Sequence, residues 1–400
     1  MTRYITTALL LGGLTLSGQL LAGSQEQAKR LHDRLAGVPP TPSTLATMAT
    51  AIDSGDAIDA AYTAMESEHF YNVTLKLFAA PWTNRDQSIF VPFNDYIATV
   101  IGMVRDDVDF RQVLQGDILY TGDASLGLPA YNASNNAHYE AMEAQDVNLK
   151  TGLVRTTQSS LTGVPANATA GVMTTRAAAK SFFIAGTNRA MFRFTLMNFM
   201  CRDLEQVHDT SRIPDRIRQD VTRSPGGDSR VFMNNCIGCH NGMDPLAQAF
   251  AYYDFEYDAE GDPEGNNGRI SYNDAGQLDP ATGTRVEAKY HFNANNFIYG
   301  YVTPDDGWDN YWRDGPNSLL GWDPSLSGSG SGAKTMGQEL AHSEAFAQCQ
   351  VEKVFANVCL RPPVDGADRG KVSEIVGSFK ASGYQLKQVF AETAVYCMGE

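Results

Sequence analysis

Hydrophobic positions recur with a helical period at both ends of the chain. The N-terminal part carries three apolar groups with i, i+3, i+4, i+7 spacing: Leu45/Met48/Ala49/Ile52, Ile58/Tyr62/Met65 and Ile97/Val100/Ile101/Val104. The C-terminal part carries three more: Val351/Val354/Phe355/Val358, Val372/Ile375/Val376/Phe379 and Leu386/Val389/Phe390/Thr393. Thr41 followed by Pro42 is typical of a helix start. These stripes predict a mainly α-helical protein whose core they form.

The middle of the chain has a different pattern. Met191–Cys201 is apolar nearly all round, which predicts a helix that is buried on most sides. Residues 254–332 are rich in Gly, Asp, Asn and aromatic residues and show little helical period. Within them, Arg269–Tyr272 and Arg285–Phe292 flank a turn-rich stretch and predict a β-hairpin. Ser327–Gly332 alternates Ser and Gly, and we expect a flexible loop there.

These patterns divide the chain into four regions. We expect a signal peptide at 1–22, an N-terminal helical region at 23–125, a central region at 126–332 with its loop-rich insertion, and a C-terminal helical module at 333–400. The fold class that follows is mainly α, with a helical body around the central segment and a small β insertion. The boundaries can also divide one compact body rather than separate domains.

The first residues resemble an export signal. Arg3 precedes an apolar run, Ile5–Leu16, and Leu20-Leu21-Ala22 supplies small-residue cleavage before Gly23. We therefore expect a bacterial protein that is periplasmic or secreted. The apolar run is too short to span a membrane, so no membrane span is expected. The formal net charge is -15, which argues against nucleic acid as a partner.

The motif with the clearest chemistry is Cys236-Ile237-Gly238-Cys239-His240, a CxxCH pattern. Two residues between the cysteines form about one turn, so both thiols face the same edge of a porphyrin. The next residue then directs an imidazole at the iron. We predict one covalently attached haem c, with Cys236, Cys239 and His240 as the binding residues and His240 as the proximal iron ligand. Gly238 would allow the backbone to pack closely on the ring.

Two other uses of the motif compete with haem. A zinc site needs four ligands, and no second close Cys/His pair exists. A redox dithiol is expected in a thioredoxin-like βαβ context, which the sequence does not show. After the motif, Asp244 is a good N-cap and Pro245 a good first residue, so a helix is predicted from Pro245 to about Tyr252 that braces His240.

The sixth iron ligand stays open at this point. Met243 lies three residues after His240 and would stay on the proximal side, so it is not expected to reach the distal face. The remaining candidates are Met173, Met197, Met200, Met233, His208 and His291. A Met ligand would raise the reduction potential, a His ligand would lower it, and an open position would allow small-ligand chemistry. The acidic run at 254–264 is expected to be a solvated loop, with calcium binding as the alternative.

The other four cysteines, Cys201, Cys349, Cys359 and Cys397, are disulfide candidates, with free thiols as the alternative. Cys349 and Cys359 should lie at opposite ends of one helix, about 15 Å apart. A disulfide needs Cα atoms within roughly 7 Å, so these two should not pair. Three consecutive helices in an up-down-up arrangement bring Cys359 near Cys397, which leaves Cys349 for Cys201.

Several segments resemble one protein family. Cys236–Phe255, CIGCHNGMDPLAQAFAYYDF, is similar to the CxxCH-x-x-[MI]-D-P-L-G-x-A-x-x-x-[FY]-D segment of the planctomycete-type cytochrome c family. Gly171-Val172-Met173-Thr174 and Arg189 resemble further family elements, although Ala190 follows Arg189 where the family has Gly. So do RLAGVPPTP, SEAFAQCQVEKVFANVCLRPP and SGYQLKQVF. Where the family has His-Arg before the first haem cysteine, this chain has Arg230 and Val231. The resemblance implies haem and export.

The expected function is single-electron transfer outside the cytoplasm by a monohaem c-type cytochrome, with a redox partner protein. One alternative is a haem enzyme, such as a peroxidase or oxidase, with an open distal site. The length of 400 residues for one haem favours this alternative, since a pure carrier needs about a hundred residues. The other alternative is a binding or assembly module with structural haem, in which the aromatic stretch Phe297–Trp322 forms an interface.

Overall fold

The N-terminal helices follow the predicted periodicity. The computed structural model describes residues 23–184, 188–220, 228–291 and 294–399, so the predicted signal peptide lies outside the described residues. Helices α1 (Ser24–Ala36), α2 (Pro42–Asp53) and α3 (Ala57–Met65) pack against one another. Thr41 Oγ1 accepts a hydrogen bond from the Thr44 N–H at 3.2 Å, and Pro42 occupies the first turn of α2, as predicted.

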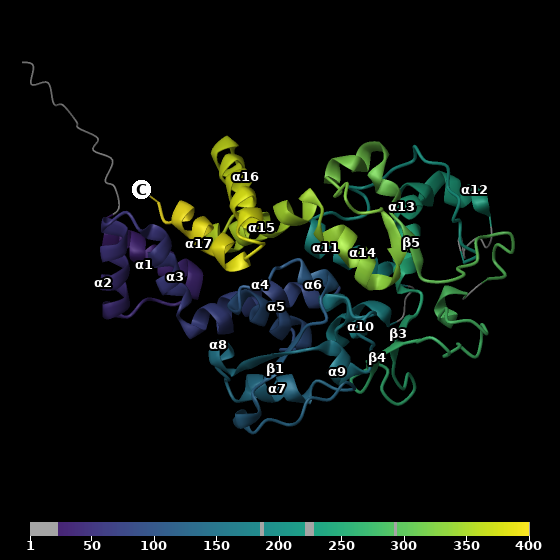
Figure 1. The fold of residues 1–400 in the computed structure, drawn as a ribbon, viewed down its shortest axis with the longest axis horizontal. Helices are drawn as coiled ribbons and strands as arrows, with labels where there is room; N and C mark the ends of the chain where they lie inside the picture. The colour runs from purple at the N-terminus through teal and green to yellow at the C-terminus, as the bar shows by residue number, and fades with distance from the viewer. Residues whose placement is uncertain (1–22, 185–187, 221–227, 292–293, 400) are drawn as a thin grey trace, which may run out of the picture.

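The C-terminal module consists of α15 (Glu344–Cys359), α16 (Gly366–Ala381) and α17 (Leu386–Cys397), which pack as three consecutive helices. Ser343 caps α15 and Asp365 caps α16 through their side-chain oxygens. α17 lies beside α1 and α3, so the first and last described helices lie together at one end of the molecule (Figure 1). Gln27 of α1 donates a hydrogen bond to the Gly399 carbonyl at 2.9 Å. The three predicted C-terminal helices are confirmed.

The central body connects these two sets of helices. It contains α4 (Lys76–Ala79), α5 (Asp95–Arg105), α6 (Gln112–Gln115), α7 (Ala137–Ala144), α8 (Leu149–Gly152), α9 (Gln158–Thr162), α10 (Arg176–Phe183), α11 (Arg189–Met200), α12 (Ser229–Val231), α13 (Ile237–Ala247) and α14 (Gly332–Ala341). α11 matches the helix predicted to be buried on most sides, and only Arg193 among its charged side chains reaches well into solvent.

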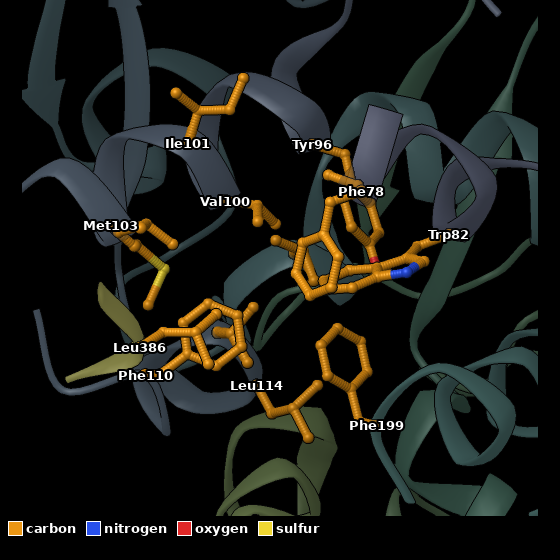
Figure 2. Close-up of a cluster of buried hydrophobic side chains, with 14 of the residues drawn as sticks. Phe78, Trp82, Tyr96, Val100, Ile101, Met103, Phe110, Leu114, Phe199 and Leu386 are labelled. Carbon is orange, nitrogen blue, oxygen red and sulfur yellow. The ribbon is translucent and has the colours of Figure 1, made fainter. Parts of the chain in front are cut away.

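One hydrophobic core crosses the predicted region boundaries. Figure 2 shows side chains that meet from α4, α5, α6, α11 and α17, with Phe78, Val100, Leu114, Phe199 and Leu386 among them. Trp82 contacts Phe199 edge-on at 5.6 Å between ring centroids. Burial of these large side chains ties the N-terminal, central and C-terminal parts together, since each apolar side chain contributes roughly 1.5–3 kcal/mol.

The strands are short, and all form two-stranded antiparallel ladders within the described residues. β1 (Leu119–Gly122) pairs with β2 (Leu153–Thr156), β3 (Tyr253–Glu256) with β4 (Arg269–Tyr272), and β5 (Gly307–Asp309) with β6 (Ser329–Ser331). The fold is therefore mainly α-helical with small β insertions, as the sequence predicts.

The predicted β-hairpin has a different partner strand. Arg269–Tyr272 is a strand, but it pairs with Tyr253–Glu256, in the register Tyr253 to Tyr272, rather than with Arg285–Phe292. The described residues of the latter segment form no strand. Lys289 and Arg285 instead pack against residues near β3. Lys289 Nζ donates to Asp254 Oδ1 at 2.7 Å, and the guanidinium of Arg285 lies over the ring of Tyr252 at 4.0 Å. Ala288–Tyr290 within this segment forms a 3₁₀ turn rather than a strand, so the predicted pairing was wrong.

The Ser/Gly segment is also more ordered than predicted. Part of Ser327–Gly332 forms β6, because Gly330 leaves room for the ring of Trp308 on the facing strand. Trp308 Nε1 donates to Thr335 Oγ1 at 2.8 Å. Trp308 and Trp312 of the aromatic stretch are buried, whereas Tyr299 is exposed. Most of that stretch therefore packs locally.

Candidate functional site

The CxxCH motif lies at the first turns of α13, after α12 and a π-helical turn at Phe232–Cys236. Both cysteines are free thiols and are half-buried. Figure 1 places α12 and α13 at the end of the molecule opposite α1. Cys236 packs beside a small apolar cluster that is separate from the main core, formed by Phe232, Ile237, Ile217 and Phe297. The two thiols therefore stand near the surface, next to apolar side chains.

His240 is oriented by a carboxylate one turn further along the same helix. Its Nδ1 atom lies 3.2 Å from Asp244 Oδ2 and 3.3 Å from Oδ1. An N–H at Nδ1 that donates to this carboxylate leaves Nε2 as the atom with a free lone pair. The ring of Phe232 meets His240 edge-on at 5.9 Å between centroids. The geometry thus selects one tautomer and presents Nε2 as a ligand atom.

A buried arginine holds Asp244 in place. Arg189 of α11 donates from Nε to Asp244 Oδ1 at 2.7 Å and from Nη2 to Oδ2 at 2.8 Å. Arg189 Nη1 also donates to Asp220 at 3.2 Å, and Arg218 Nε lies 3.5 Å from Asp220. Burial alone would raise the pKa of Asp244, but the charge of Arg189 and contact with His240 hold this pKa well below its usual range. The carboxylate that faces His240 is therefore fully charged.

The predicted helix start at Asp244 and Pro245 is wrong. α13 begins at Ile237 and continues through Pro245 to Ala247. The Asp244 side chain pairs with Arg189 and His240 and does not cap a helix, so no helix N-terminus forms there. Pro245 removes one helical hydrogen bond, and the chain then tightens into a 3₁₀ turn at Gln248–Phe250. The continuous helix is what brings His240 and Asp244 onto one face.

A second face of α13 is formed by two glycines one turn apart. A Cβ atom at Gly238 would collide with the imidazole of His208, and one at Gly242 would collide with the indole of Trp312. Gly238 therefore admits His208, rather than the porphyrin approach that we predicted for it. The backbone around His208 follows the motif closely: Asp209 N–H donates to the Gly238 carbonyl at 2.9 Å.

The candidate sixth ligands lie in different surroundings. Met173, Met200 and Met243 are buried in the main core, and Met197 lines a surface hollow beside Cys201. His291 Nε2 lies 3.4 Å from the Thr303 carbonyl. Met233 is exposed and precedes the first motif cysteine by three residues. Of the named candidates, only Met233 and His208 are placed beside the motif.

The surroundings of the thiols differ from those of a reactive dithiol. Burial raises the pKa of the Cys239 thiol, and the negative charges of Glu205 and Asp203 raise it further. Catalytic dithiols need a lowered pKa, because the thiolate is the nucleophile. The motif also follows a helical turn rather than a strand. Within the residues that the structure describes, no group of three or more His, Cys, Asp or Glu side chains could hold a metal ion.

Comparison with known proteins finds no relative. No family model matches the chain, and no curated protein or solved structure matches it. The similarity of Cys236–Phe255 to the planctomycete-type cytochrome c family therefore remains an expectation from the sequence. What the motif can do follows from its own residues and their contacts.

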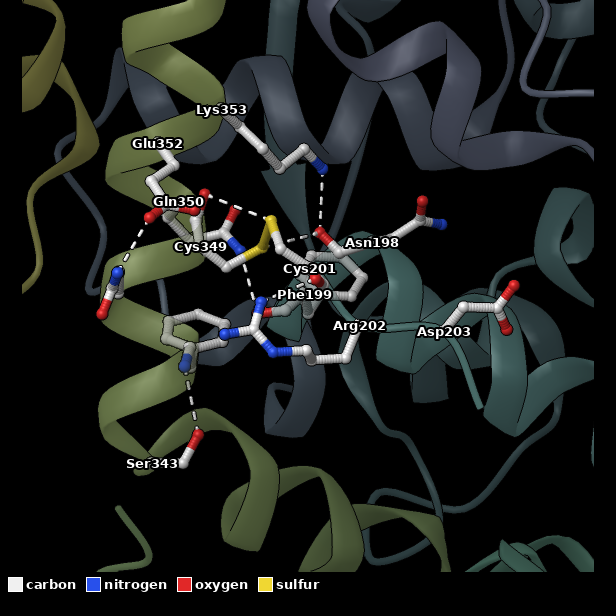
Figure 3. Close-up of a disulfide and its surroundings, with 12 residues drawn as sticks. Asn198, Phe199, Cys201, Arg202, Asp203, Ser343, Cys349, Gln350, Glu352 and Lys353 are labelled. Carbon is white, nitrogen blue, oxygen red and sulfur yellow. Dashed lines mark hydrogen bonds between the residues drawn. A yellow bond between two sulfur atoms is a disulfide. The ribbon is translucent and has the colours of Figure 1, made fainter. Parts of the chain in front are cut away.

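The remaining cysteines form the two predicted disulfides. Cys201 pairs with Cys349, and Cys359 pairs with Cys397, with Cα atoms 5.3 Å and 5.5 Å apart. Figure 3 shows the first of these between the end of α11 and α15. The connectivity is the one expected from the up-down-up order of α15, α16 and α17. Both bonds are compatible with an oxidising compartment.

The acidic run uses its carboxylates in local structure. Asp258 Oδ1 accepts from the Gly261 N–H at 3.0 Å, Asp262 Oδ2 accepts from the Asn267 N–H at 2.6 Å, and Arg269 pairs with Glu256 at 2.9 Å. These side chains organise the β3–β4 connection. In the described part of the chain, no helix is long and apolar enough to cross a membrane.

Proposed function

We propose that this chain is an exported monohaem c-type cytochrome that transfers single electrons outside the cytoplasm. Cys236 and Cys239 would hold the haem, and His240 would bind its iron through Nε2. The observation that carries the proposal is the combination of two free, accessible thiols with an imidazole whose Nδ1 is already bound to Asp244. The haem, when bound, supplies an iron that changes between the ferric and ferrous states.

The thiols fit covalent attachment. Each sulfur forms a bond to a vinyl carbon and its proton goes to the other carbon, so no oxidant is consumed. A thiol with a raised pKa, as at Cys239, stays protonated and resists oxidation in an oxidising compartment. The other four cysteines are already paired, which leaves only the motif thiols for such a bond.

The surface beside Cys236 also supports the proposal. Phe297 packs in the cluster with Cys236, and the next residues, Ile298 and Tyr299, expose their side chains to solvent. The segment is held in place because Phe297 N–H donates to the Gln219 carbonyl at 3.1 Å. Adjacent exposed apolar side chains are typical of a surface that binds a ligand or a partner protein. A porphyrin attached at Cys236 would cover part of this row.

The localisation is part of the same proposal. Haem c is attached outside the cytoplasm, where the two disulfides also form. The expected signal peptide would deliver the chain there, as a periplasmic or secreted bacterial protein. Electrons would then pass to a partner protein at the exposed apolar row.

Haem staining after denaturing electrophoresis tests the attachment. Wild-type protein made with a working maturation system should give a haem band, Cys236→Ala and Cys239→Ala should weaken it, and the double variant should abolish it. Cys359→Ala with Cys397→Ala is the control, because it removes two cysteines that are bonded to each other outside the motif and should keep the band. Folded wild-type protein without covalent haem would overturn the proposal.

A second candidate function is a haem enzyme with an open distal site. The observation in its favour is the charged carboxylate of Asp244, since a carboxylate partner makes an axial imidazole a stronger electron donor. The optical spectra of the ferric and ferrous protein separate the two. A low-spin spectrum without carbon monoxide binding supports the carrier. Rapid carbon monoxide binding or peroxide turnover supports the enzyme.

A further inference from the structure

A hollow of about 460 Å³ opens at the surface beside the Cys201–Cys349 disulfide, which joins the end of α11 to α15. Its walls include the apolar side chains of Trp82 and Met197, and Lys353 of α15 also lines it. The volume is in the range of about 300–1,000 Å³ that is usual for sites that bind small molecules. No residue of the CxxCH motif lines the hollow, so the proposed haem function does not use it.

The amine of Lys353 is held against aromatic rings. Its Nζ atom donates a hydrogen bond to the Asn198 carbonyl at 2.8 Å, as Figure 3 shows. The same atom lies 3.4 Å from the centroid of the Trp82 ring. It lies 5.9 Å from the ring centroids of Phe78 and Phe199. Three aromatic rings and one backbone carbonyl therefore surround the amine.

No carboxylate compensates a positive charge on this amine. In the described part of the chain, Lys353 forms no ion pair. Among the described residues that line the hollow, the only carboxylate is that of Asp203, and both of its oxygens bind Arg193, at 2.7 and 2.6 Å. The other cation in the lining, Arg202, adds positive charge.

The amine of Lys353 therefore loses its proton more readily than that of an exposed lysine. Burial lowers the pKa of Lys353 well below its usual value. Contact with the indole of Trp82 favours the ammonium, but by less than the loss of hydration disfavours it when no counter-ion is present. The hollow thus contains a neutral amine at neutral pH.

A neutral amine in an apolar site is a nucleophile towards carbonyl compounds. Its lone pair attacks the carbonyl carbon, a C=N bond forms, and the carbonyl oxygen leaves as water with both amine protons. The reaction consumes neither an oxidant nor a reductant. When the imine takes up a proton, its N–H can keep the hydrogen bond that Lys353 already makes to the Asn198 carbonyl. The site therefore holds both the reacting amine and an acceptor for the product.

The walls of the hollow determine which carbonyl compound fits. Trp82 and Met197 offer an aromatic face and a thioether, on which a flat or apolar group packs well. An aldehyde carries one substituent on its carbonyl carbon, so this carbon can approach an enclosed amine more closely than that of a ketone. The surroundings therefore favour an aldehyde with an apolar substituent.

We propose that Lys353 is the attachment site of an apolar aldehyde, which enters this hollow and forms an imine with the Lys353 amine. The site is independent of haem attachment, because it shares no residue with the CxxCH motif. An imine hydrolyses reversibly in water, so the aldehyde is carried by the protein rather than consumed.

Reductive labelling of the folded full-length protein tests this proposal. Sodium cyanoborohydride converts an imine into a stable secondary amine, and peptide mapping by mass spectrometry then gives the labelling rate of each lysine. With benzaldehyde at pH 7, Lys353 should be labelled at least about ten-fold faster than Lys29 of α1, whose side chain is 54% exposed. Protein unfolded in guanidinium chloride is the control. There the two lysines should react at similar rates, because the hollow no longer exists.

The pH dependence and a second aldehyde test the site further. An exposed lysine gains neutral amine about ten-fold per pH unit below about pH 10, so the advantage of Lys353 over Lys29 should shrink between pH 7 and pH 9. Glycolaldehyde, a polar probe, should give a smaller preference for Lys353 than benzaldehyde. Four outcomes would overturn the proposal: no faster labelling of Lys353 at pH 7, an advantage that is constant with pH, the same advantage in unfolded protein, or equal preference with both aldehydes.

Discussion

The Nδ1 atom of His240 lies 3.2 Å from the carboxylate of Asp244, and both residues stand on one face of α13. The carboxylate is buried, with 2% of its side chain exposed, and Arg189 binds both of its oxygens. Solvent therefore has little influence on the orientation of this imidazole. The ring is fixed from inside the protein, by Asp244 and by the arginine that holds it.

With haem c bound as proposed, removing the charge of Asp244 should raise the reduction potential. The carboxylate would give His240 imidazolate character, which would stabilise ferric over ferrous iron. Asp244→Asn keeps an acceptor but loses the charge, so a ten-fold loss of ferric preference corresponds to a rise of about 60 mV. Spectroelectrochemical titration measures it. Glu205→Gln, which removes a charge near Cys239 but not near His240, is the control. Equal shifts in the two variants would contradict this role.

Arg189→Met should destabilise the fold strongly. It leaves the buried carboxylates of Asp244 and Asp220 without their shared partner, a change that typically costs about 3–5 kcal/mol. Arg193→Met is a matched control one turn further along α11. Arg193 binds Asp203 through Nε and Nη2 in the same way, but its side chain is 44% exposed rather than 17%.

The control substitution should lower the free energy of unfolding by less than about 1 kcal/mol, since exposed ion pairs contribute little. Urea unfolding followed by circular dichroism gives both values for wild type and the two variants. Similar losses for Arg189→Met and Arg193→Met would show that burial of the Asp244 pair does not matter for stability.

The helices could be predicted because they depend on local spacing, and the disulfide pairing followed because that spacing excluded one pair and the up-down-up order of three helices favoured another. The stripe from Val351 to Val358 defines one helix, and its length alone excludes a bond between Cys349 and Cys359. The His240–Asp244 contact was also within reach, since four residues separate the two. The contact was missed because proline is common at helix starts, so Pro245 was interpreted as the first residue of a new helix rather than as part of α13.

Contacts between distant segments could not be predicted in this way. Arg189 and Asp244 are 55 residues apart, and nothing in the periodicity indicates that a buried charge on α11 faces α13. Strand pairing fails for a similar reason. Tyr253–Glu256 follows directly on a helical segment, and its choice as the partner of Arg269–Tyr272 depends on packing around Tyr252 and Tyr290.

Ionisation of the Glu287 carboxyl should lower the free energy of unfolding as the pH rises. Burial and the nearby charge of Asp254 raise its pKa from 4.5 to about 7. Between these values the folded state binds more protons than the unfolded state, so the free energy of unfolding decreases as pH rises through this range. Glu287→Gln removes this effect. It should be more stable relative to wild type at pH 8 than at pH 5.

Urea unfolding at both pH values checks the Glu287 prediction. Glu374→Gln is the control, because Glu374 is an exposed carboxylate on α16 that pairs with Lys371 and does not act on Glu287. Its stability difference from wild type should change little between the two pH values. A Glu287→Gln variant whose difference from wild type is also constant would contradict the linkage.

The segment between Cys201 and Asp209 connects a disulfide to the motif. The Leu204 carbonyl lies 3.6 Å from Cys239 Sγ, and Asp209 N–H donates to the Gly238 carbonyl. At its other end, Cys201 is anchored to α15 through Cys349, where Lys353 Nζ also donates to the Asn198 carbonyl at 2.8 Å (Figure 3). The motif backbone is thus braced by a segment that a covalent bond fixes.

Loss of this anchor should lower haem attachment more than loss of the other disulfide. Replacing Cys201 and Cys349 by Ala opens a loop with a sequence separation of 148, and replacing Cys359 and Cys397 opens one of 38. The chain-entropy model gives similar losses of about 5 and 4 kcal/mol. Because the second pair does not brace the motif, a difference in haem content between the two variants reports on the brace rather than on stability.

Soret absorbance per folded protein, measured on variants produced at a temperature where both are folded, should be reduced only for the Cys201/Cys349 variant. Equal haem content in the two would show that the segment does not support attachment.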